Sequence, residues 1–434
     1  MKKSPIKFAK KTLNAGVNVL GRLHKSASVA TLSALRVAKG EKMDAYLLKE
    51  AFMQMGVTYI KLGQFIASTP TLFPREYVLA FADCLDSTPP VPFSQICEVL
   101  SEELSGLTGK SLEEIFEVID PAPLASASIA QVHRATLKDG RQVALKVQKS
   151  HVQTIMQTDL GVLHSVFWTM ERLMPAVRAA SLSPIVDEIR TRMAAETDFL
   201  AEARHIDKFH EFLSSAGLGH ITAPTVHHKL STKRVLVMDL LMGESLVDDK
   251  LSEMTARHHT TPQKLMSDVL DAWFLSLMKT GEFHADLHAG NLLYLYDGRI
   301  AFLDFGLVGQ IKPASLQACF SWVHALQTGD YQGMARAMVD IGMTHTLDDG
   351  QITRLADDLE RMIDKTTHDG HEPEHLSVFM LEMTQIGKRY GIHFPRDFAL
   401  LTKQLLYFDR FMVTLAPDME LFEGERLQIV QAEH

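Results

Sequence analysis

The stretch from His284 to Gly306 constrains the fold of this 434-residue chain more than any other part of it. Two apolar, β-prone runs, 292–296 and 299–303, flank Asp297-Gly298. An Asp-Gly pair between two such runs is the strongest short-range signal for a β-hairpin. A hairpin folds the chain back on itself. We therefore expect Asn291, just before the hairpin, and Asp304, just after it, to lie side by side.

Polar residues in the same stretch are spaced as in a kinase catalytic loop. His284, Asp286 and Asn291 fit the pattern H-x-D-x-x-x-x-N, and residues 304–306 read D-F-G. The oxygens of Asn291 and Asp304 suit Mg²⁺, which binds a few protein oxygens together with phosphate and water. Asp286 is placed to accept or orient the proton of an attacking hydroxyl. The competing interpretation is a polar loop before an ordinary hairpin, but two motifs at this spacing favour the catalytic one.

A second patterned region, residues 124–148, predicts a strand, a loop of small residues, a strand, an Asp-Gly turn and a third strand. Lys146 is expected on the face of the third strand opposite Val143, Leu145 and Val147. In kinases a glycine-rich loop covers the phosphates and a strand lysine binds them; here Ala and Ser replace Gly, which removes freedom at positive φ. A plain hairpin with an exposed lysine is the alternative. The loop residues expected to contact a nucleotide are Ala125, Ser126, Ala127, Ser128, Ile129 and Ala130.

Apolar periodicity from residue 183 to 206 predicts one continuous helix that starts at a Ser183-Pro184 cap. Glu196 and Glu202 flank its buried stripe. A carboxylate in that position requires a cationic partner. Lys146 is a candidate partner for either of them, and pairing with basic residues of the same helix is the alternative.

The other elements follow from shorter patterns. Residues 235–243 predict a buried strand that leaves into a connection with free backbone groups for an adenine edge, and 262–279 predict a helix leading into the His284 loop. Helices are also predicted over 46–79, broken at Pro70 and Pro74, over 92–107 and 112–117, and from 313 onward with breaks near Gly329, Gly350 and Gly370. The expected adenine contacts are Met238, Asp239, Leu240 and Leu241.

Composition places the chain among large globular proteins, with 46% hydrophobic and 22% charged residues. Its three cysteines have no metal-ligand spacing, which fits a reducing cytosol. No apolar run approaches the roughly 20 residues needed to cross a bilayer, and no continuous apolar run follows the N-terminal lysines as in a signal peptide. We therefore expect a cytoplasmic protein with no transmembrane helix.

Charge is concentrated at the N-terminus. Residues 1–45 carry ten Lys or Arg and two acids, a formal +8, which leaves −17 for the rest of a chain whose total is −9. The arm has a loosely helical apolar stripe, so it could bind the inner face of an anionic membrane or cover part of the protein body. An acidic body argues against binding to nucleic acid.

These motifs together resemble the UbiB/AarF atypical kinase family, which is associated with ubiquinone biosynthesis. The resemblance covers about residues 46–310. The family's K-x-G-Q motif matches residues 61–64, its alanine-rich loop matches 125–131, and its E-x-D element matches 196–198. The catalytic loop matches 284–291, and the metal loop begins at Asp304.

The resemblance implies an α+β, bilobal protein-kinase-like fold with a small β-sheet N-lobe, a helical C-lobe and an added N-terminal helical extension. The corresponding ranges are 1–45 for the arm, 46–115 for the extension, 116–245 for the N-lobe and 246–434 for the C-lobe. It also implies that the chain binds ATP or ADP together with Mg²⁺. The implied partners are membrane lipid or quinone-biosynthesis proteins. Lys61 would join Asp286 and Lys146 as a catalytic residue. The residues of the implied ion-pair gate are Gln64, Glu196, Asp198 and Glu202.

The chain departs from the family pattern in three places. Leu287 and Ala289 replace the prolines of the usual catalytic loop, no Ala-Pro-Glu element follows Asp304, and polar residues 423–434 stand where many relatives have membrane helices. We therefore expect no membrane anchorage through C-terminal helices of that kind. The expected function is a Mg²⁺-dependent ATP-binding kinase or ATPase with an unidentified acceptor. A small-molecule kinase of the choline or aminoglycoside kinase type and a nucleotide-gated scaffold are the alternatives, and the oligomeric state is open.

Overall fold

A computed structural model of the chain describes residues 44–67, 75–81, 89–173, 182–342, 347–367, 376–417 and 419. It divides into two compact units. Of the described residues, the N-unit holds those up to Ala201 together with His227–Asp239, and the C-unit holds Glu202–Val226 and those from Leu240. All but the last two residues of the predicted basic arm, 1–45, lie outside the described residues, so its behaviour stays a prediction.

The N-unit contains a four-stranded antiparallel sheet in the order β1-β2-β3-β5. Its strands are β1 (Phe116–Ser126), β2 (Ala130–Leu137), β3 (Gln142–Gln148) and β5 (Val235–Asp239). Between β2 and β3, the Gly140 N–H donates to the Leu137 carbonyl at 2.9 Å, and Gly140 has a φ of 86° that favours glycine. The predicted succession of strand, small-residue loop, strand, Asp-Gly turn and strand is confirmed.

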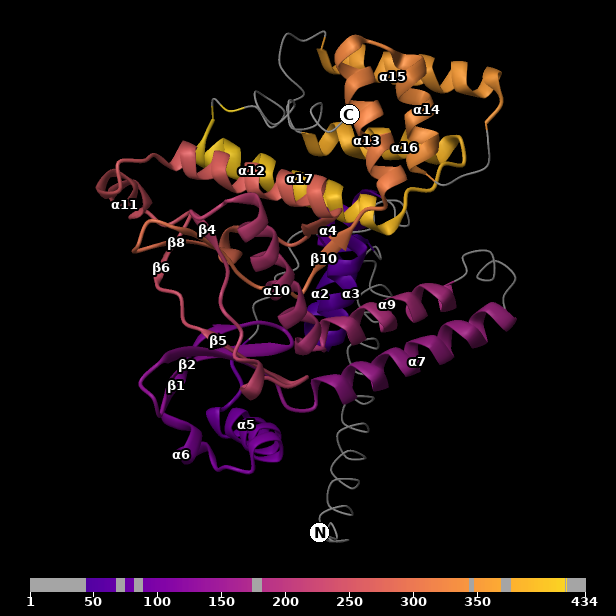
Figure 1. The fold of residues 1–434 in the computed structure, drawn as a ribbon. Helices are drawn as coiled ribbons and strands as arrows, with labels where there is room; N and C mark the ends of the chain where they lie inside the picture. Colours follow the sequence, from indigo (N-terminus) through magenta and orange to yellow (C-terminus); the bar gives the residue numbers. More distant parts are fainter. Residues whose placement is uncertain are drawn as a thin grey trace. The chain divides into compact units, whose positions relative to one another are not determined.

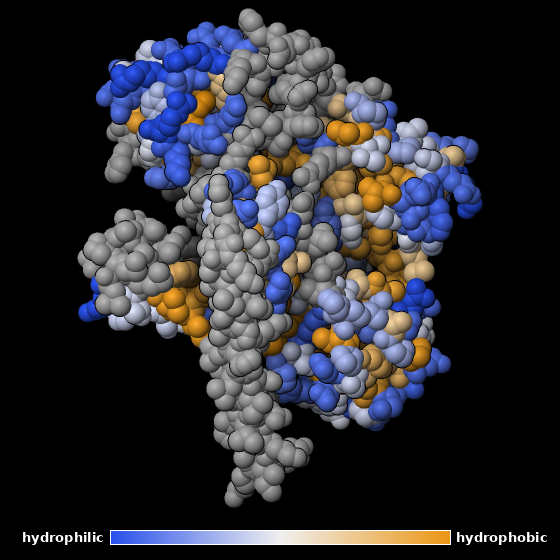
Figure 2. Space-filling view, turned by 180° about the vertical axis from the view of Figure 1, so that it is seen from behind, coloured by the Kyte–Doolittle hydropathy of each residue, from blue (hydrophilic) through white to orange (hydrophobic). Residues whose placement is uncertain are grey.

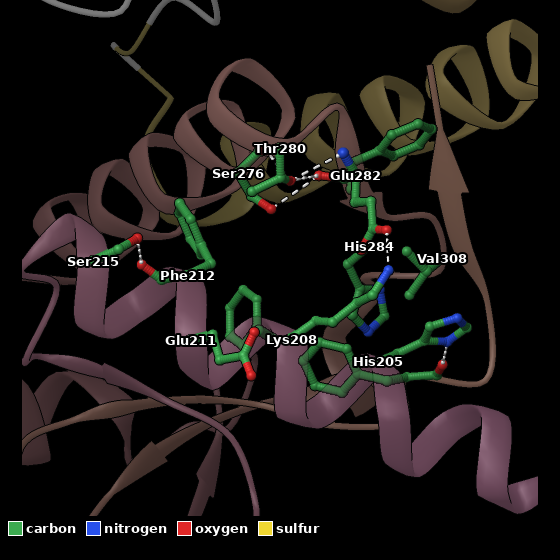
Figure 3. A pocket seen from close by; sticks show the side chains of 13 residues that line it. His205, Lys208, Glu211, Phe212, Ser215, Ser276, Thr280, Glu282, His284 and Val308 are labelled. Atoms are coloured by element: carbon green, nitrogen blue, oxygen red, sulfur yellow. Dashed lines mark hydrogen bonds and ion pairs between the residues drawn. The ribbon is translucent and has the colours of Figure 1, made fainter. Parts of the chain in front are cut away.

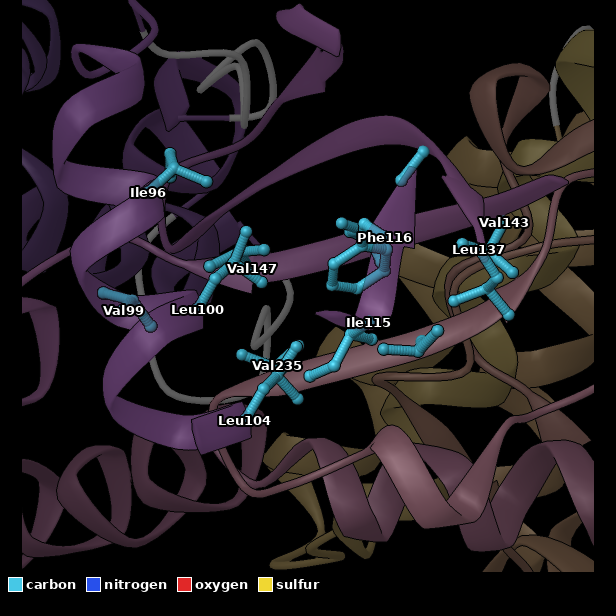
Figure 4. Packing of buried hydrophobic residues seen from close by; sticks show 13 residues of the cluster. Ile96, Val99, Leu100, Leu104, Ile115, Phe116, Leu137, Val143, Val147 and Val235 are labelled. Carbon is cyan, nitrogen blue, oxygen red and sulfur yellow. The ribbon is translucent and has the colours of Figure 1, made fainter. Parts of the chain in front are cut away.

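One face of this sheet packs against the two predicted helices, α5 (Phe93–Thr108) and α6 (Leu112–Ile115) (Figure 4). Alternate residues of a strand point to opposite faces. Val143, Leu145 and Val147 of β3 therefore enter this core while Lys146 faces away, as the sequence indicates. The core residues are Ile96, Val99, Leu100, Leu104, Ile115, Phe116, Ala135, Leu137, Val143, Leu145, Val147, Val235 and Val237.

The remaining N-unit helices are α2 (Ala45–Met55), α3 (Val57–Ala67), α4 (Arg75–Phe81), α7 (Val152–Leu173) and α9 (Leu182–Glu196). The prediction of an unbroken helix from residue 46 to Pro70 is wrong. Gly56 separates α2 from α3 with a φ of 102°, a conformation that side-chain-bearing residues rarely adopt. Pro70 and Pro74, the predicted breaks, lie outside the described residues. A short 3-10 helix, η1 (His228–Leu230), precedes β5.

The predicted continuous helix over 183–206 is also wrong. The chain leaves the helix at Thr197, and α10 (Phe199–Ala216) starts two residues later, while Ser183 lies within α9 and not before it. Asp198 caps α10, since its Oδ1 accepts the Leu200 N–H at 3.1 Å and its carbonyl accepts the Ala201 N–H at 2.9 Å. Such local side-chain bonds compete with helix continuation, and hydrophobic periodicity does not reveal them.

The C-unit contains a four-stranded sheet in the order β4-β9-β8-β6 and a separate antiparallel pair of β7 and β10. The strands are β4 (Ile221–Thr222), β6 (Gly243–Ser245), β7 (Glu282–His284), β8 (Leu292–Leu295), β9 (Ile300–Phe302) and β10 (Val308–Gln310). The predicted hairpin is confirmed, because β8 pairs antiparallel with β9 and the Leu295 N–H donates to the Arg299 carbonyl at 2.8 Å. Gly298 at its tip has a φ of 87°.

Seven α-helices complete the described part of the C-unit. They are α11 (Leu251–Arg257), α12 (Pro262–Thr280), α13 (Pro313–Thr328), α14 (Tyr331–Ile341), α15 (Asp349–Thr367), α16 (Leu376–Arg389) and α17 (Arg396–Leu415), and the 3-10 helix η2 (Ala289–Asn291) lies in the catalytic loop. Within this unit α17 runs beside α12 (Figure 1), and the Trp273 and Phe408 rings are 5.1 Å apart.

The predicted helix break at Gly329 is confirmed, because this residue ends α13 in the left-handed conformation. The predicted break near Gly350 is also confirmed, because residues 347–348 are not helical and α15 starts at Asp349. Asp348 accepts the Gln351 N–H at 2.8 Å, so α15 starts before Gly350 and takes the glycine into its first turn. Gly370 lies outside the described residues. The α+β class is confirmed, while the four domain ranges stay a prediction.

Within the described part of the chain, none of the helices combines the length and apolar character needed to span a bilayer. On the face drawn in Figure 2, orange apolar residues occur in separate groups among blue polar ones. The exposed large apolar residues come from different elements, among them Trp168 of α7 and Val413 of α17.

Candidate active site

One row of residues crosses the N-unit sheet on the face away from the core. Ala125 pairs with Val132, Val132 with Lys146, and Lys146 with Leu236. Residues paired across strands share a face, so the start of the small-residue loop and Lys146 are on the same side. Lys146 is 7% exposed, and its ammonium nitrogen is 5.4 Å from the centre of the Phe199 ring.

The small-residue loop is a tight turn between β1 and β2. The Ala127 N–H donates to the Ala130 carbonyl at 2.9 Å, and Ser128 is buried. Positive φ occurs at none of these residues, which explains why Ala and Ser are tolerated where glycine would be expected. The Ser126 hydroxyl oxygen is buried and has no hydrogen-bond partner among the described residues. A buried hydroxyl in that state is uncommon, and water or a ligand usually supplies its partner.

Two side chains that the sequence analysis missed hold this loop against residues 89–91. The Gln131 amide accepts a hydrogen bond from the Val91 N–H and donates to the Val91 carbonyl at 3.4 Å. The Lys149 ammonium donates to the Pro89 carbonyl at 3.2 Å, while the Lys149 N–H donates to the Ile129 carbonyl at 2.9 Å. Both side chains are buried, so they fix the loop from its own unit.

Of the expected adenine contacts, Met238 pairs with Ala144 and therefore lies on the Lys146 face. Asp239 pairs with Val143, and its carboxylate accepts from the His227 ring nitrogen Nε2 at 2.7 Å. The expected adenine contact of Asp239 would therefore involve its backbone groups and not its carboxylate. Leu240 and Leu241 follow β5 and are partly exposed.

The expected gate residues of the N-unit divide into two arrangements. Lys61 of α3 and Glu196 of α9 form an ion pair, with Nζ and Oε2 2.9 Å apart and side chains only 13% and 27% exposed. Gln64 lies one turn further along α3. Asp198 instead caps α10 and is 3.8 Å from the Lys233 ammonium. The cationic partner of Glu196 in the structure is therefore Lys61.

In the C-unit, His284 orients the catalytic loop. Its Nδ1 accepts the Asp286 N–H at 3.2 Å, so the proton is assigned to Nε2, which donates to the Leu303 carbonyl at 2.9 Å. The Trp273 indole N–H donates to the His284 carbonyl at 2.9 Å. Burial lowers the pKa of His284 from its ordinary value of 6.5. The imidazole is therefore a neutral link between the catalytic loop and the strand before Asp304.

The hairpin brings Asn291 next to the segment that ends in Asp304. The Leu303 N–H donates to the Asn291 carbonyl at 2.8 Å. The Asn291 side-chain NH₂ donates to the Asp286 carbonyl at 2.9 Å, which leaves the amide oxygen as its ligand atom. Asp304 is exposed and has a φ of 50°. A non-glycine residue in that region costs of order 1–3 kcal/mol and often marks a functional site.

Phe305 and Gly306 lie along α10. The Phe305 carbonyl is 3.0 Å from His205 Nδ1, and the buried Phe305 ring is 5.0 Å from the Phe209 ring. A Cβ added at Gly306 would be 3.9 Å from Glu202 Oε2, so this buried glutamate adjoins the D-F-G segment. The structure thus brings Glu202 and Asp304 into one part of the C-unit.

A pocket of about 380 Å³ is lined by residues of α10, α12 and β7 together with Phe305 and Val308 (Figure 3). Rings of α10 and β7 form part of its wall, and Lys208 and Glu282 form an ion pair of 2.5 Å beside it. His284 also lines it.

Two residues of α17, which no sequence motif indicated, also contact the catalytic loop. Lys403 donates from Nζ to Asp286 Oδ1 at 2.7 Å. The Gln404 side chain accepts the Leu287 N–H at 2.7 Å and donates to the Leu287 carbonyl at 2.9 Å. The sequence offered one signal for Gln404: it is a polar residue on an apolar helical stripe, three residues after Leu401 and four before Phe408. Nothing in the sequence indicates what it contacts, 117 residues upstream.

Comparison with known proteins identifies the family. The model of the ABC1 atypical kinase-like domain matches residues 83–338. The chain belongs to this ABC1 family. The predicted resemblance to UbiB/AarF kinases and the kinase-like fold are thereby confirmed. Lys61, Lys403 and Gln404 lie outside the matched residues.

Relatives extend over more of the ABC1-family chain. An uncharacterised aarF domain-containing protein kinase of Arabidopsis thaliana, described as chloroplastic, is 39% identical and covers 96% of this chain and 80% of its own length. An uncharacterised protein of Mycobacterium tuberculosis is 32% identical over 88% of this chain and 76% of its own. A solved M. tuberculosis structure in complex with erythromycin is 23% identical, covers 82% of this chain and 91% of its own, and has a TM-score of 0.49.

Proposed function

We propose that this ABC1-family chain is a Mg²⁺-dependent ATP-binding atypical kinase or ATPase. The observation that carries the proposal is the assembly of Asp286, Asn291 and Asp304 by one hairpin and the buried His284. Phosphoryl transfer requires mainly positioning and charge stabilisation from the protein. These three oxygen-bearing side chains are the minimum set for both tasks.

The nucleotide would be bound by residues that share the open face of the N-unit sheet. Lys146 would contact the phosphates, and the turn over residues 125–130 would cover them. The orphaned Ser126 hydroxyl supports this assignment, because a phosphate oxygen would supply its missing partner. Backbone groups over 238–241 would bind the adenine edge, and ADP would fit the same contacts.

The residues also fit Mg²⁺. Asn291 offers an amide oxygen and Asp304 an exposed carboxylate, whereas no group of three or more His, Cys, Asp or Glu suited to a metal occurs in the described ranges. Two protein oxygens suit an ion that takes its other ligands from phosphate and water. When bound, the ion would neutralise charge on the phosphates.

Asp286 would accept the proton of the attacking hydroxyl or water. The oxygen of that group forms the new bond to the γ-phosphorus, and the bond from phosphorus to the bridging oxygen breaks as ADP leaves. The Lys61–Glu196 pair, with Gln64, Asp198 and Glu202, would regulate access. The family resemblance adds a role in ubiquinone biosynthesis at the inner face of the membrane, with lipid or quinone-biosynthesis proteins as partners.

The test compares the wild-type chain with Asp286→Asn. We expect ATP to bind both with Mg²⁺ present, measured by calorimetry, because the amide keeps the shape of the carboxylate. We expect ADP release to fall by 10²- to 10⁴-fold, the usual contribution of a positioned proton acceptor. Equal turnover in the two proteins would refute the role of Asp286, and absence of ATP binding to the wild type would refute the proposal. A soluble alcohol that accepts the γ-phosphate rapidly would identify a small-molecule kinase.

A further inference from the structure

Helix α17 contacts the catalytic loop through side chains of consecutive residues. Lys403 reaches the carboxylate of Asp286, with 2.7 Å between Nζ and Oδ1. Gln404 binds both backbone polar groups of Leu287, the next residue of the loop. A single turn of a distant helix thus contacts the proposed proton acceptor and its neighbour.

These two contacts have different consequences. The Gln404 amide is fully buried and pairs with backbone only, so its role is to fix the path of the loop. The Lys403 and Asp286 side chains are 24% and 33% exposed, so their contact is shielded but reaches solvent. Exposed ion pairs contribute little to stability. This partly exposed pair is likewise not part of a buried core.

The ammonium group of Lys403 is held in place from a second side. Its Nζ is 5.3 Å from the centre of the Tyr407 ring, one turn along α17, and that ring is 6.3 Å from the His288 ring of the catalytic loop. A cation above an aromatic face is attracted by the ring. Lys403 is therefore anchored between its own helix and the loop.

We propose that Lys403 is a positioning residue for the reaction, which holds the Asp286 carboxylate in the orientation that receives the proton. This inference rests on the proposed function. During transfer, Asp286 takes the proton from the attacking oxygen, that oxygen bonds to the γ-phosphorus, and the bridging oxygen leaves with the electron pair of the broken bond. The lysine hydrogen bond restricts rotation of the carboxylate. Its loss acts on the chemical step and not on nucleotide binding.

The test uses the full chain and measures ATP turnover with Mg²⁺ in three variants. In Lys403→Met we expect kcat to fall by about 10- to 100-fold, below the full effect of a general base, with KM for ATP within twofold of wild type. Lys403→Arg keeps a donor near Asp286 and should recover at least a third of the wild-type kcat. The matched control is Lys264→Met, because Lys264 of α12, whose side chain is 62% exposed, forms a pair with Asp268 at 2.8 Å. Its kcat should equal that of wild type.

The outcomes separate this inference from the proposed function. If the wild type turns over ATP and Lys403→Met has the same kcat, the inference is overturned and the proposed function remains intact. A parallel rise in KM and loss of thermal stability, with no rescue by Lys403→Arg, would assign Lys403 a purely structural role and also overturn it. A wild-type chain that neither binds nor hydrolyses ATP would refute the proposed function itself.

Discussion

Replacing Gln404 by Met tests whether α17 fixes the catalytic loop. The Gln404 side chain is fully buried, as is Leu287, and their two hydrogen bonds measure 2.7 and 2.9 Å. Methionine matches glutamine in length but has no amide, so the Leu287 N–H and carbonyl both lose their partner. A buried group without its partner costs about 1–3 kcal/mol. Two such groups, partly relieved by movement of the loop, should lower the free energy of unfolding by about 2–4 kcal/mol.

The assay is equilibrium urea unfolding followed by circular dichroism, with hydrogen exchange of the Leu287 amide as a local readout. The control is Gln332→Met, because Gln332 makes only a 3.5 Å contact with Thr353 near the surface, and changes at such sites usually stay within about 0.5 kcal/mol. We expect faster exchange at Leu287 in Gln404→Met alone. A loss of stability no larger than that of the control, with Leu287 exchange unchanged, would refute the reasoning.

Two further predictions concern the loops. Because burial lowers the folded-state pKa of His284 from 6.5, the unfolded chain binds more protons there, so this residue's contribution to stability is complete above about pH 6.5 and declines as the pH falls below it. Unfolding free energies measured from pH 7.5 to 5 should therefore fall more steeply in wild type than in His284→Gln, and parallel profiles would contradict this. Ser126→Ala should leave stability unchanged or higher while weakening ATP binding by about 3- to 10-fold, as expected for one lost hydrogen bond of about 1 kcal/mol; calorimetry with unchanged affinity would remove Ser126 from the nucleotide site.

Local patterns predicted those parts of the molecule that local chemistry decides. Asp297-Gly298 determined the hairpin, and the alternation around Lys146 determined which face it occupies. The hairpin also predicted that Asn291 and Asp304 lie side by side, and the Leu303 N–H, next to Asp304, donates to the Asn291 carbonyl. These features depend on contacts between residues that are close in sequence, or on the strict two-residue alternation of side chains along a strand.

The incorrect or missing predictions involve contacts that hydrophobic periodicity does not reveal. Asp198 ends one helix and caps the next, so Glu196 and Glu202 lie on different helices, although apolar spacing runs through both. The contact of Lys403 with Asp286 spans 117 positions, and no local signal identifies it.

We propose that Asn291 and Asp304, at the two ends of one hairpin, bind the Mg²⁺ that strengthens ATP binding. Calorimetric titration of ATP into the wild-type chain and Asp304→Asn, each with and without Mg²⁺, tests it most directly. We predict that Mg²⁺ strengthens ATP binding to the wild type and has no effect on Asp304→Asn, whose amide lacks the carboxylate charge. Equal affinity of the two proteins with Mg²⁺ present would contradict the claim.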